Sequence, residues 1–91
     1  MMVKRGKLEI IRDILLIIRD NRNSIKPTPL IRKSQMSSLR FKEYYNDLIS
    51  RGLVMEVINE KKDKYITLTQ KGFMFLERYR TIIDFIEEFE L

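Results

Sequence analysis

Residues 5–20 carry the pattern of an amphipathic helix. Apolar residues recur there at spacings of three and four, while charged residues such as Arg12 and Asp13 fall on the other side. The apolar side is formed by Leu8, Ile11, Ile14, Leu15 and Ile18. This pattern predicts a first helix over residues 5–20, followed by a polar break over residues 21–26.

A short second helix is expected after this break. Thr28 followed by Pro29 is typical of an N-cap residue and a first helical position, because proline needs no amide partner there. The predicted helix covers roughly residues 29–34, and Gln35 with Met36 forms the turn that follows.

A third helix is predicted over residues 38–50. Ser37 is a suitable N-cap for it, and Gly52 a suitable residue just after its end. The residues expected to face the core are Phe41, Tyr44, Tyr45, Leu48 and Ile49. Two helices joined by a tight turn after a first helix form a helix-turn-helix pattern.

A β-hairpin and a final helix complete the chain. Residues 53–58 and 64–68 are strand-like, with Ile66 and Leu68 on one face, and the charged residues 59–63 form the turn between them. Thr69 is expected to cap a last helix that runs to about Glu90. The predicted fold is therefore mainly α with a small β-hairpin (α+β): a winged helix-turn-helix with a C-terminal dimerisation helix.

The charge is unevenly distributed along the 91 residues. Residues 81–91 hold four acids and no base, so residues 1–80 hold all 18 bases and the other nine acids, a net charge of +9. A basic body with an acidic end favours a polyanionic partner for the body, and nucleic acid is the first candidate. A basic surface that only maintains solubility is the alternative.

The composition argues against catalysis and against metal binding. The chain has no cysteine and no histidine, so a thiolate nucleophile, the commonest general base and the commonest metal ligand are missing. Its three glycines are too scattered to form a phosphate-binding loop. We therefore expect no enzyme, no metal, no cofactor and no small-molecule substrate. No membrane span or signal peptide is expected either, which predicts a cytoplasmic, nucleoid-associated protein.

Three segments resemble known winged-helix proteins. The segment LISRGLV at residues 48–54 is similar to the exit of their recognition helix, and YITLTQKG at residues 65–72 is similar to their second wing strand and the following helix start. The segment RGKLEII at residues 5–11 resembles the start of archaeal winged-helix proteins of the small, basic, ten-kilodalton chromatin type. The resemblance implies duplex DNA binding and dimerisation through an antiparallel coiled coil, although the final helix is shorter here than in that family.

A helix of this kind docks in the major groove with its N-terminal residues at the base edges. In the third predicted helix, six residues are not needed for the core and are candidates for contact with bases. Arg40 could bind guanine, Asn46 adenine, and Leu39 a thymine methyl group. The six are Ser38, Leu39, Arg40, Lys42, Glu43 and Asn46. The alternative is that they only solvate an exposed helix face.

Phosphate contacts are expected from four other places. Arg32 and Lys33 lie on the helix that crosses the backbone in such folds, and the cap residue Ser37 leaves amides at a helix N-terminus. The wing and the N-terminal arm supply the remaining bases. These are Lys61, Lys62 and Lys64 in the wing and Lys4, Arg5 and Lys7 in the arm.

The last helix carries more apolar surface than one small domain can cover. We expect residues 1–69 to form the DNA-binding domain and residues 70–91 to form an antiparallel coiled coil with a second copy, which gives a homodimer. The expected interface residues are Tyr79, Ile82, Ile83, Phe85, Ile86 and Phe89. The alternative is that this helix folds back onto the first helix of its own chain.

Three functions remain open from the sequence. The first is a sequence-specific transcriptional regulator, with residues 38–50 in the major groove and the wing, residues 59–64, on the minor groove or on phosphates. The second is an architectural, chromatin-type protein with little sequence preference. The third belongs to another class, a winged-helix module that binds only proteins.

Overall fold

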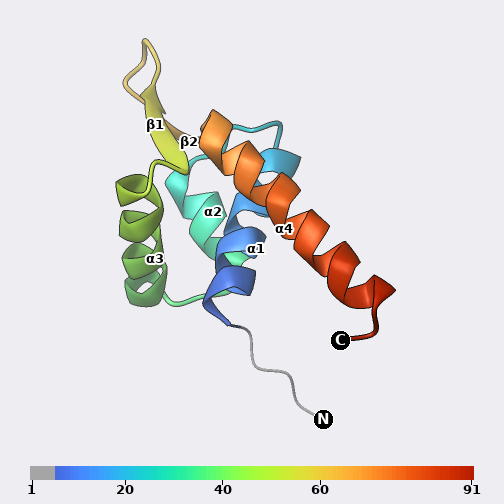
Figure 1. Ribbon diagram of the computed structural model, residues 1–91. Helices are drawn as coiled ribbons and strands as arrows, with labels where there is room; N and C mark the ends of the chain where they lie inside the picture. The colour runs from blue at the N-terminus through green and yellow to red at the C-terminus, as the bar shows by residue number, and fades with distance from the viewer. Residues whose placement is uncertain (1–5) are drawn as a thin grey trace.

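The computed structural model describes residues 6–91 and contains four helices and one hairpin. The helices are α1 (Lys7–Asp20), α2 (Pro27–Ser34), α3 (Ser38–Ser50) and α4 (Gln70–Glu88), and the strands are β1 (Val54–Ile58) and β2 (Lys64–Leu68). Figure 1 shows α1, α2 and α3 gathered into one body, from which the hairpin and α4 project in different directions. The predicted order of elements is confirmed.

Helix α1 is the centre of the core because its apolar side is covered from several directions. It packs against α2, α4 and β2. The buried apolar side chains are Ile10, Ile11, Ile14, Leu15, Ile18, Ile25, Leu30, Phe41, Leu48, Leu53, Val54, Ile66, Leu68 and Leu76. Leu8 was expected on the buried side but is 57% exposed, since it lies in the first turn, below the part of α1 that the other elements cover.

The second helix begins earlier than the sequence indicated. Its first residue is Pro27 and its N-cap is Lys26, so the prediction of Thr28 as cap and Pro29 as first residue is wrong. Both prolines fit within the first turn because the amides there have no partner inside the helix. Gln35 ends the helix in the left-handed conformation, with φ of 59°, and forms the expected turn.

The third helix has the predicted bounds. The Ser37 hydroxyl accepts a hydrogen bond from the Arg40 amide at 3.2 Å, as expected for an N-cap. Gly52 follows the helix with φ of +72°, a conformation that glycine adopts without strain. Phe41 and Leu48 are buried, but Ile49 is 38% exposed, because it lies toward the edge of the packed side.

The hairpin is a two-stranded antiparallel sheet in which Glu56 faces Ile66. Ile25, from the loop between α1 and α2, adds a third short segment through hydrogen bonds with Ile66 on the other edge of β2. Only the base of the hairpin joins the core, since β1 is exposed beyond Val54. The tip therefore projects from the body as a wing.

Helix α4 begins in tight contact with the hairpin base. Thr69 caps it by accepting from the Gly72 amide, and a Cβ atom at Gly72 would lie 2.3 Å from the Leu53 carbonyl oxygen. Glycine is required there because any side chain would push the helix off the sheet. The helix ends at Glu88, two residues before the predicted end.

The two halves of α4 have different surroundings. In the first half Leu76 is buried, and Tyr79 accepts a hydrogen bond from Arg12 of α1. The second half of the helix extends past the other elements (Figure 1), and the longest dimension of the molecule is 50 Å against 27 and 22 Å. Folding back onto α1 thus occurs, but only for the first half.

Candidate nucleic-acid interface

Helix α3 presents one side to the core and leaves the opposite side uncovered. Phe41 and Leu48 are the residues that it buries. At about 100° per residue, Leu39, Glu43 and Asn46 lie roughly opposite these two on the helix. All three are exposed, and Leu39 is 73% exposed. An outer side of this kind is free to enter a groove.

The other three candidate base-contacting residues flank this outer side. Ser38 and Lys42 lie toward the hairpin, whereas Arg40 lies toward the start of α1, with its guanidinium 6.0 Å from the centre of the Tyr44 ring. All three are exposed. The structure therefore brings all six candidates to one accessible part of α3, with Arg40 and Lys42 on opposite flanks.

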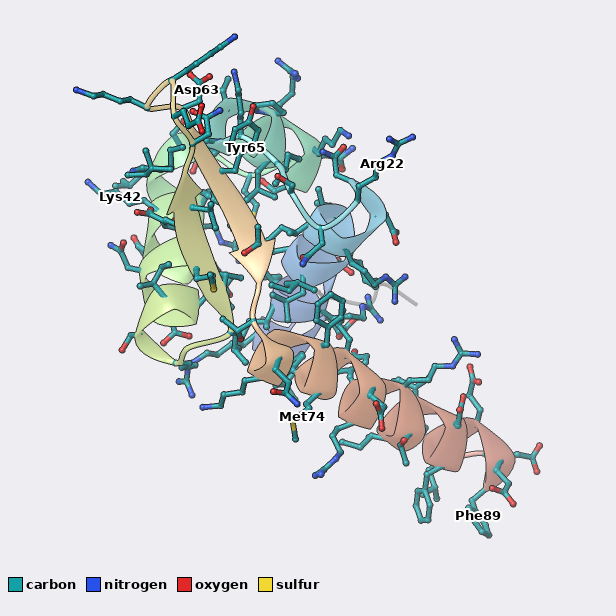
Figure 2. All side chains as sticks on the ribbon, turned by 90° about the horizontal axis from the view of Figure 1, so that it is seen from above. Arg22, Lys42, Asp63, Tyr65, Met74 and Phe89 are labelled. Atoms are coloured by element: carbon teal, nitrogen blue, oxygen red, sulfur yellow. The ribbon has the colours of Figure 1, made fainter. Side chains whose placement is uncertain are left out.

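The wing lies beside α3 and carries an exposed basic tip. Lys61 and Lys62 are exposed, and Asn59 stabilises the turn by accepting from the amides of Lys61 and Asp63, both at 2.9 Å. Figure 2 shows Asp63 and Lys42 at the end of the molecule opposite Phe89. A single face thus combines the outer side of α3 with the wing.

Tyr45 joins α3 to the wing, a link that the sequence did not reveal. Its hydroxyl donates a hydrogen bond to Glu56 of β1, and Lys64 of β2 lies 3.5 Å from the same carboxylate oxygen. Burial, reinforced by the bond to Glu56, raises the pKa of Tyr45 above its ordinary value. The spacing of Tyr45 identified it only as a core residue, and the ring indeed stacks on Phe41 at 5.9 Å between centroids.

The remaining basic residues predicted to contact phosphates differ in whether their side chains already contact another residue. Arg32 is exposed in the last turn of α2, and the neighbouring Lys33 donates to the Asn21 side chain at 3.3 Å. Lys7 lies 3.9 Å from Asp47 of α3, and Lys64 is engaged by Glu56. Lys4 and Arg5 lie outside the described residues.

A second pair missed by the sequence lies between α2 and the wing. The ammonium group of Lys26, the N-cap residue of α2, is 5.7 Å from the centre of the Tyr65 ring on β2. A cation near an aromatic face is held there by the charge distribution of the ring. Lys26 adds a positive charge beside the wing, and only the folded chain brings the two residues together.

The predicted dimer residues lie on the projecting half of α4. Tyr79 and Ile83 are half-buried, and the other four are more exposed than is usual for large apolar side chains. Their exposed fractions are 55% for Ile82, 54% for Phe85, 37% for Ile86 and 57% for Phe89. Phe85 and Phe89 pack on each other, with ring centroids 4.9 Å apart.

A groove of about 570 Å³ lies between α1 and α4. Its apolar lining consists of Leu16 from α1 and Phe73, Leu76, Tyr79 and Ile83 from α4. Its charged lining consists of Arg12, Asp13, Arg19, Glu77 and Arg80. Of the exposed apolar residues further along α4, Ile86 lies on the same side of the helix as Tyr79 and Ile83, whereas Ile82, Phe85 and Phe89 lie on another side.

Residues 6–91 offer neither a metal centre nor a membrane span. No group of three or more acidic side chains is close enough to hold a metal ion in this part of the chain. Over the same residues, no helix has the length and apolar character that crossing a membrane requires.

The chain is similar to known families and structures. The sequence model of a family described as winged helix-turn-helix matches residues 4–87. No curated protein matches the sequence. Three solved structures give informative similarities, all of which extend over most of this chain.

The first similar structure is Sso10a-2, a DNA-binding protein from Sulfolobus solfataricus, with 22% identity, a TM-score of 0.72, and coverage of 94% of this chain and 86% of that one. F-93 of SSV1 has 26% identity and a TM-score of 0.64, and the match covers 94% of this chain and 99% of F-93. MepR, a transcription regulator of the Staphylococcus aureus multidrug efflux pump MepA, has 16% identity, a TM-score of 0.74, and coverage of 87% of this chain but 59% of its own.

Proposed function

The chain belongs to the winged helix-turn-helix family, and from this membership and the exposed face of α3 and the wing we propose that it binds double-stranded DNA. The observation that carries the proposal is the outer side of α3: it is uncovered, it holds polar and charged side chains, and the basic wing tip projects beside it. In this arrangement α3 enters the major groove and the wing lies on the minor groove or on phosphates.

The exposed residues on the outer side of α3 would contact the edges of the bases and so recognise the sequence. Asn46 suits adenine, Arg40 suits guanine, and Leu39 suits a thymine methyl group. Glu43, between them on the outer side, would be repelled by phosphates but can accept a hydrogen bond from cytosine. A carboxylate in the middle of the binding face favours reading of bases over simple coating of the backbone.

Phosphate contacts would fix the position of α3 without reading sequence. Lys61 and Lys62 at the wing tip and Arg32 on α2 are the most accessible candidates, and Lys26 extends this basic surface. Lys33, Lys64 and Lys7 would first have to leave the partners that they contact in the free protein. The amides at the N-terminus of α3 also suit a phosphate, except the Arg40 amide, which Ser37 already binds.

We further propose that residues 70–91 join two copies into a homodimer. The support is the exposed apolar side of the projecting half of α4, which pairing with a second copy would cover. Two copies related by a two-fold axis would present two α3 helices to one duplex. The natural target is then a short two-fold-related site, and the role that follows is that of a transcriptional regulator.

Selection of bound sequences from random duplexes tests the regulatory role directly. Strong enrichment of one two-fold-related motif is the expected result. A featureless pool with retained affinity would instead assign the protein an architectural role of the chromatin type. The likeness to Sso10a-2, a DNA-binding protein, is compatible with both roles because it concerns the fold.

The salt dependence of binding tests the underlying contact with duplex DNA. Each phosphate neutralised by a lysine or arginine releases counterions, so affinity must fall steeply between low and moderate salt. A duplex affinity that does not change with salt would reject the phosphate contacts, and the absence of any affinity for duplex DNA would reject the DNA-binding proposal. The fold would then serve as a protein-interaction module. For a DNA-binding protein of this kind, association with the nucleoid is the expected location.

A further inference from the structure

The wing projects from the body on a narrow base (Figure 1). Val54, Ile66 and Leu68 are buried at this base, and beyond Val54 the whole of β1 is exposed. At about 3.4 Å per residue, the turn that begins at Asn59 lies about 17 Å beyond Val54. A rotation of about 10° at the base would therefore move the tip of the wing by about 3 Å, which is half the width of a minor groove.

Tyr45 and Glu56 connect the projecting part of the hairpin to α3. The Tyr45 hydroxyl donates a hydrogen bond to the Glu56 carboxylate, two residues beyond the buried start of β1. Over residues 6–91, no other hydrogen bond or ion pair joins a side chain of α3 to a side chain of the hairpin. The Tyr45 ring stacks on buried Phe41, so the donor is itself anchored in the core. This link resists rotation of the wing about its base.

Lys26 contacts the opposite face of the wing. Successive side chains of a strand point to opposite faces of the sheet, so Tyr65 lies on the face away from Glu56, which is paired with Ile66. The Lys26 ammonium group lies 5.7 Å from the centre of the Tyr65 ring. The wing is therefore held from α3 on one face and from the start of α2 on the other.

We propose that Glu56, together with Tyr45, is a positioning residue for DNA binding: it fixes the angle between α3 and the wing, and so the distance along the duplex between the bases that α3 contacts and the phosphates that the wing tip contacts. The proposal rests on the DNA binding proposed above and deepens it. In this role Glu56 does not contact DNA, because phosphates would repel its carboxylate. It acts through the wing, since a wing that already has the right angle loses little freedom on binding.

The ion pair between Glu56 and Lys64 is the other possible role of this carboxylate. The two groups are 3.5 Å apart and both side chains are partly exposed, so the pair adds little stability. If holding Lys64 were the main role, any substitution that removes the charge would free this lysine for a phosphate and have the same effect on binding. The positioning role instead depends on whether the new side chain can still accept a hydrogen bond from Tyr45.

Two substitutions of Glu56 separate these roles. Glu56→Gln and Glu56→Ala both remove the negative charge and free Lys64, but only the glutamine carbonyl oxygen can accept from the Tyr45 hydroxyl. We expect Glu56→Ala to bind duplex DNA several-fold more weakly than Glu56→Gln, with a salt slope lower by about 1, because the wing neutralises fewer phosphates. Equal affinities and equal slopes for the two variants would reject the positioning role and leave the ion pair as the role of Glu56.

Tyr45→Phe tests the positioning role without any change of charge. It should reduce the salt slope by about 1 although no lysine or arginine is removed. In this background the double change Lys61→Ala and Lys62→Ala should cost less affinity than in the original chain, since both changes affect the same contacts. Tyr44→Phe makes the same chemical change one residue earlier and should leave the slope as it is. A loss of stability alone would not alter the slope of a chain that remains folded, so an original slope with additive losses would overturn the proposal.

A distance measurement in the free protein separates this proposal from the DNA-binding proposal. Spin labels are attached at Glu43→Cys on α3 and Glu60→Cys in the wing turn, which is selective because the chain has no other cysteine. Dilution with unlabelled chain removes distances between copies. We expect a narrow distribution of distances that broadens with Tyr45→Phe and not with Tyr44→Phe.

The outcomes for the two proposals are distinguishable. A distribution that Tyr45→Phe leaves unchanged would reject the positioning role even if the chain binds duplex DNA with the expected salt dependence. A distribution that broadens in a chain without affinity for duplex DNA would show that the link holds the wing, but it would reject the role in DNA binding together with the proposed function.

Discussion

The outer side of α3 and the projecting half of α4 are both exposed, but their side chains differ in kind. The α3 side is mostly polar and charged and needs no cover in water, with Leu39 as its single large apolar residue. The α4 half shows several large apolar side chains together with acidic residues. Exposure alone therefore does not identify a binding surface; the chemistry of the exposed side chains indicates which partner each surface fits.

The two surfaces also differ in how they are held. The α3 side is anchored by buried Phe41 and Leu48 and by the link from Tyr45 to the wing. Helix α4 is anchored through its first half, where Gly72 and Leu76 are buried and Tyr79 accepts a hydrogen bond from Arg12, and its projecting half has no buried residue. A polar surface anchored on both sides is suited to positioning side chains on DNA, whereas an apolar surface is suited to burial against a partner. Single substitutions can therefore change one surface and leave the other intact.

The largest expected effect is on the proposed dimer. Ile86→Asp should give monomers, because a carboxylate would be buried in the apolar contact at a cost of several kcal/mol, on the order of 3. Sedimentation measures the mass, and circular dichroism should show an intact fold, since Ile86 is 37% exposed in the single chain. Leu8→Asp is the matched control, as Leu8 is exposed on α1 outside the proposed contact. Dimers that persist in the Ile86 variant would move the interface.

The next effect concerns base reading. Arg40→Ala should weaken binding by about 1–3 kcal/mol and relax the preference at one base pair, because alanine cannot make the two hydrogen bonds to guanine. Affinity for the selected motif and for its single-base variants provides the measurement. Lys42→Ala, on the opposite flank of α3, serves as the comparison. A motif and an affinity that both stay unchanged would remove Arg40 from the reading surface.

The wing lysines should act without regard to sequence. The double variant Lys61→Ala and Lys62→Ala should weaken binding to all duplexes alike and reduce the salt slope by about 2, one unit for each phosphate that is no longer neutralised. Titration at several salt concentrations measures this slope. Glu60→Gln is a control at the same turn that removes no base. If the salt slope stays the same, the wing does not contact phosphates.

The smallest effect is expected at the link between α3 and the wing. Tyr45→Phe removes one hydrogen bond and should lower the stability of the fold by about 1 kcal/mol. Because the folded pKa of Tyr45 is raised, its contribution is complete below the unfolded pKa of about 10 and declines as pH rises above it. Urea unfolding at neutral pH and at high pH measures the difference.

Tyr44→Phe is the control for this pair, since the Tyr44 ring lies beneath Arg40 and not beside Glu56. The decline in stability at high pH should disappear in the Tyr45 variant and persist in the Tyr44 variant. If both variants keep the same decline, another group is responsible for it.

The sequence by itself determined the elements and their order, because each depends on local signals. Ser37, Gly52 and Thr69 end or begin their helices through contacts with their own neighbours in the chain, and the alternation around Ile66 sets the buried face of β2. Local signals were less informative where two neighbouring residues are almost equally suitable as the start of a helix. Thr28 with Pro29 resembles a helix start, and the structure begins the helix at Pro27 because either proline suits a first turn.

Only the tertiary structure decided what lies beside what. Tyr45 was identifiable as a core residue, but its bond to Glu56 depends on the angle between α3 and the hairpin. Gly72 is required because Leu53, distant in sequence, passes against it. The apolar repeat of α4 likewise does not show how far along the helix the rest of the same chain packs against it. That limit depends on how α4 is placed against α1, with which it forms the groove.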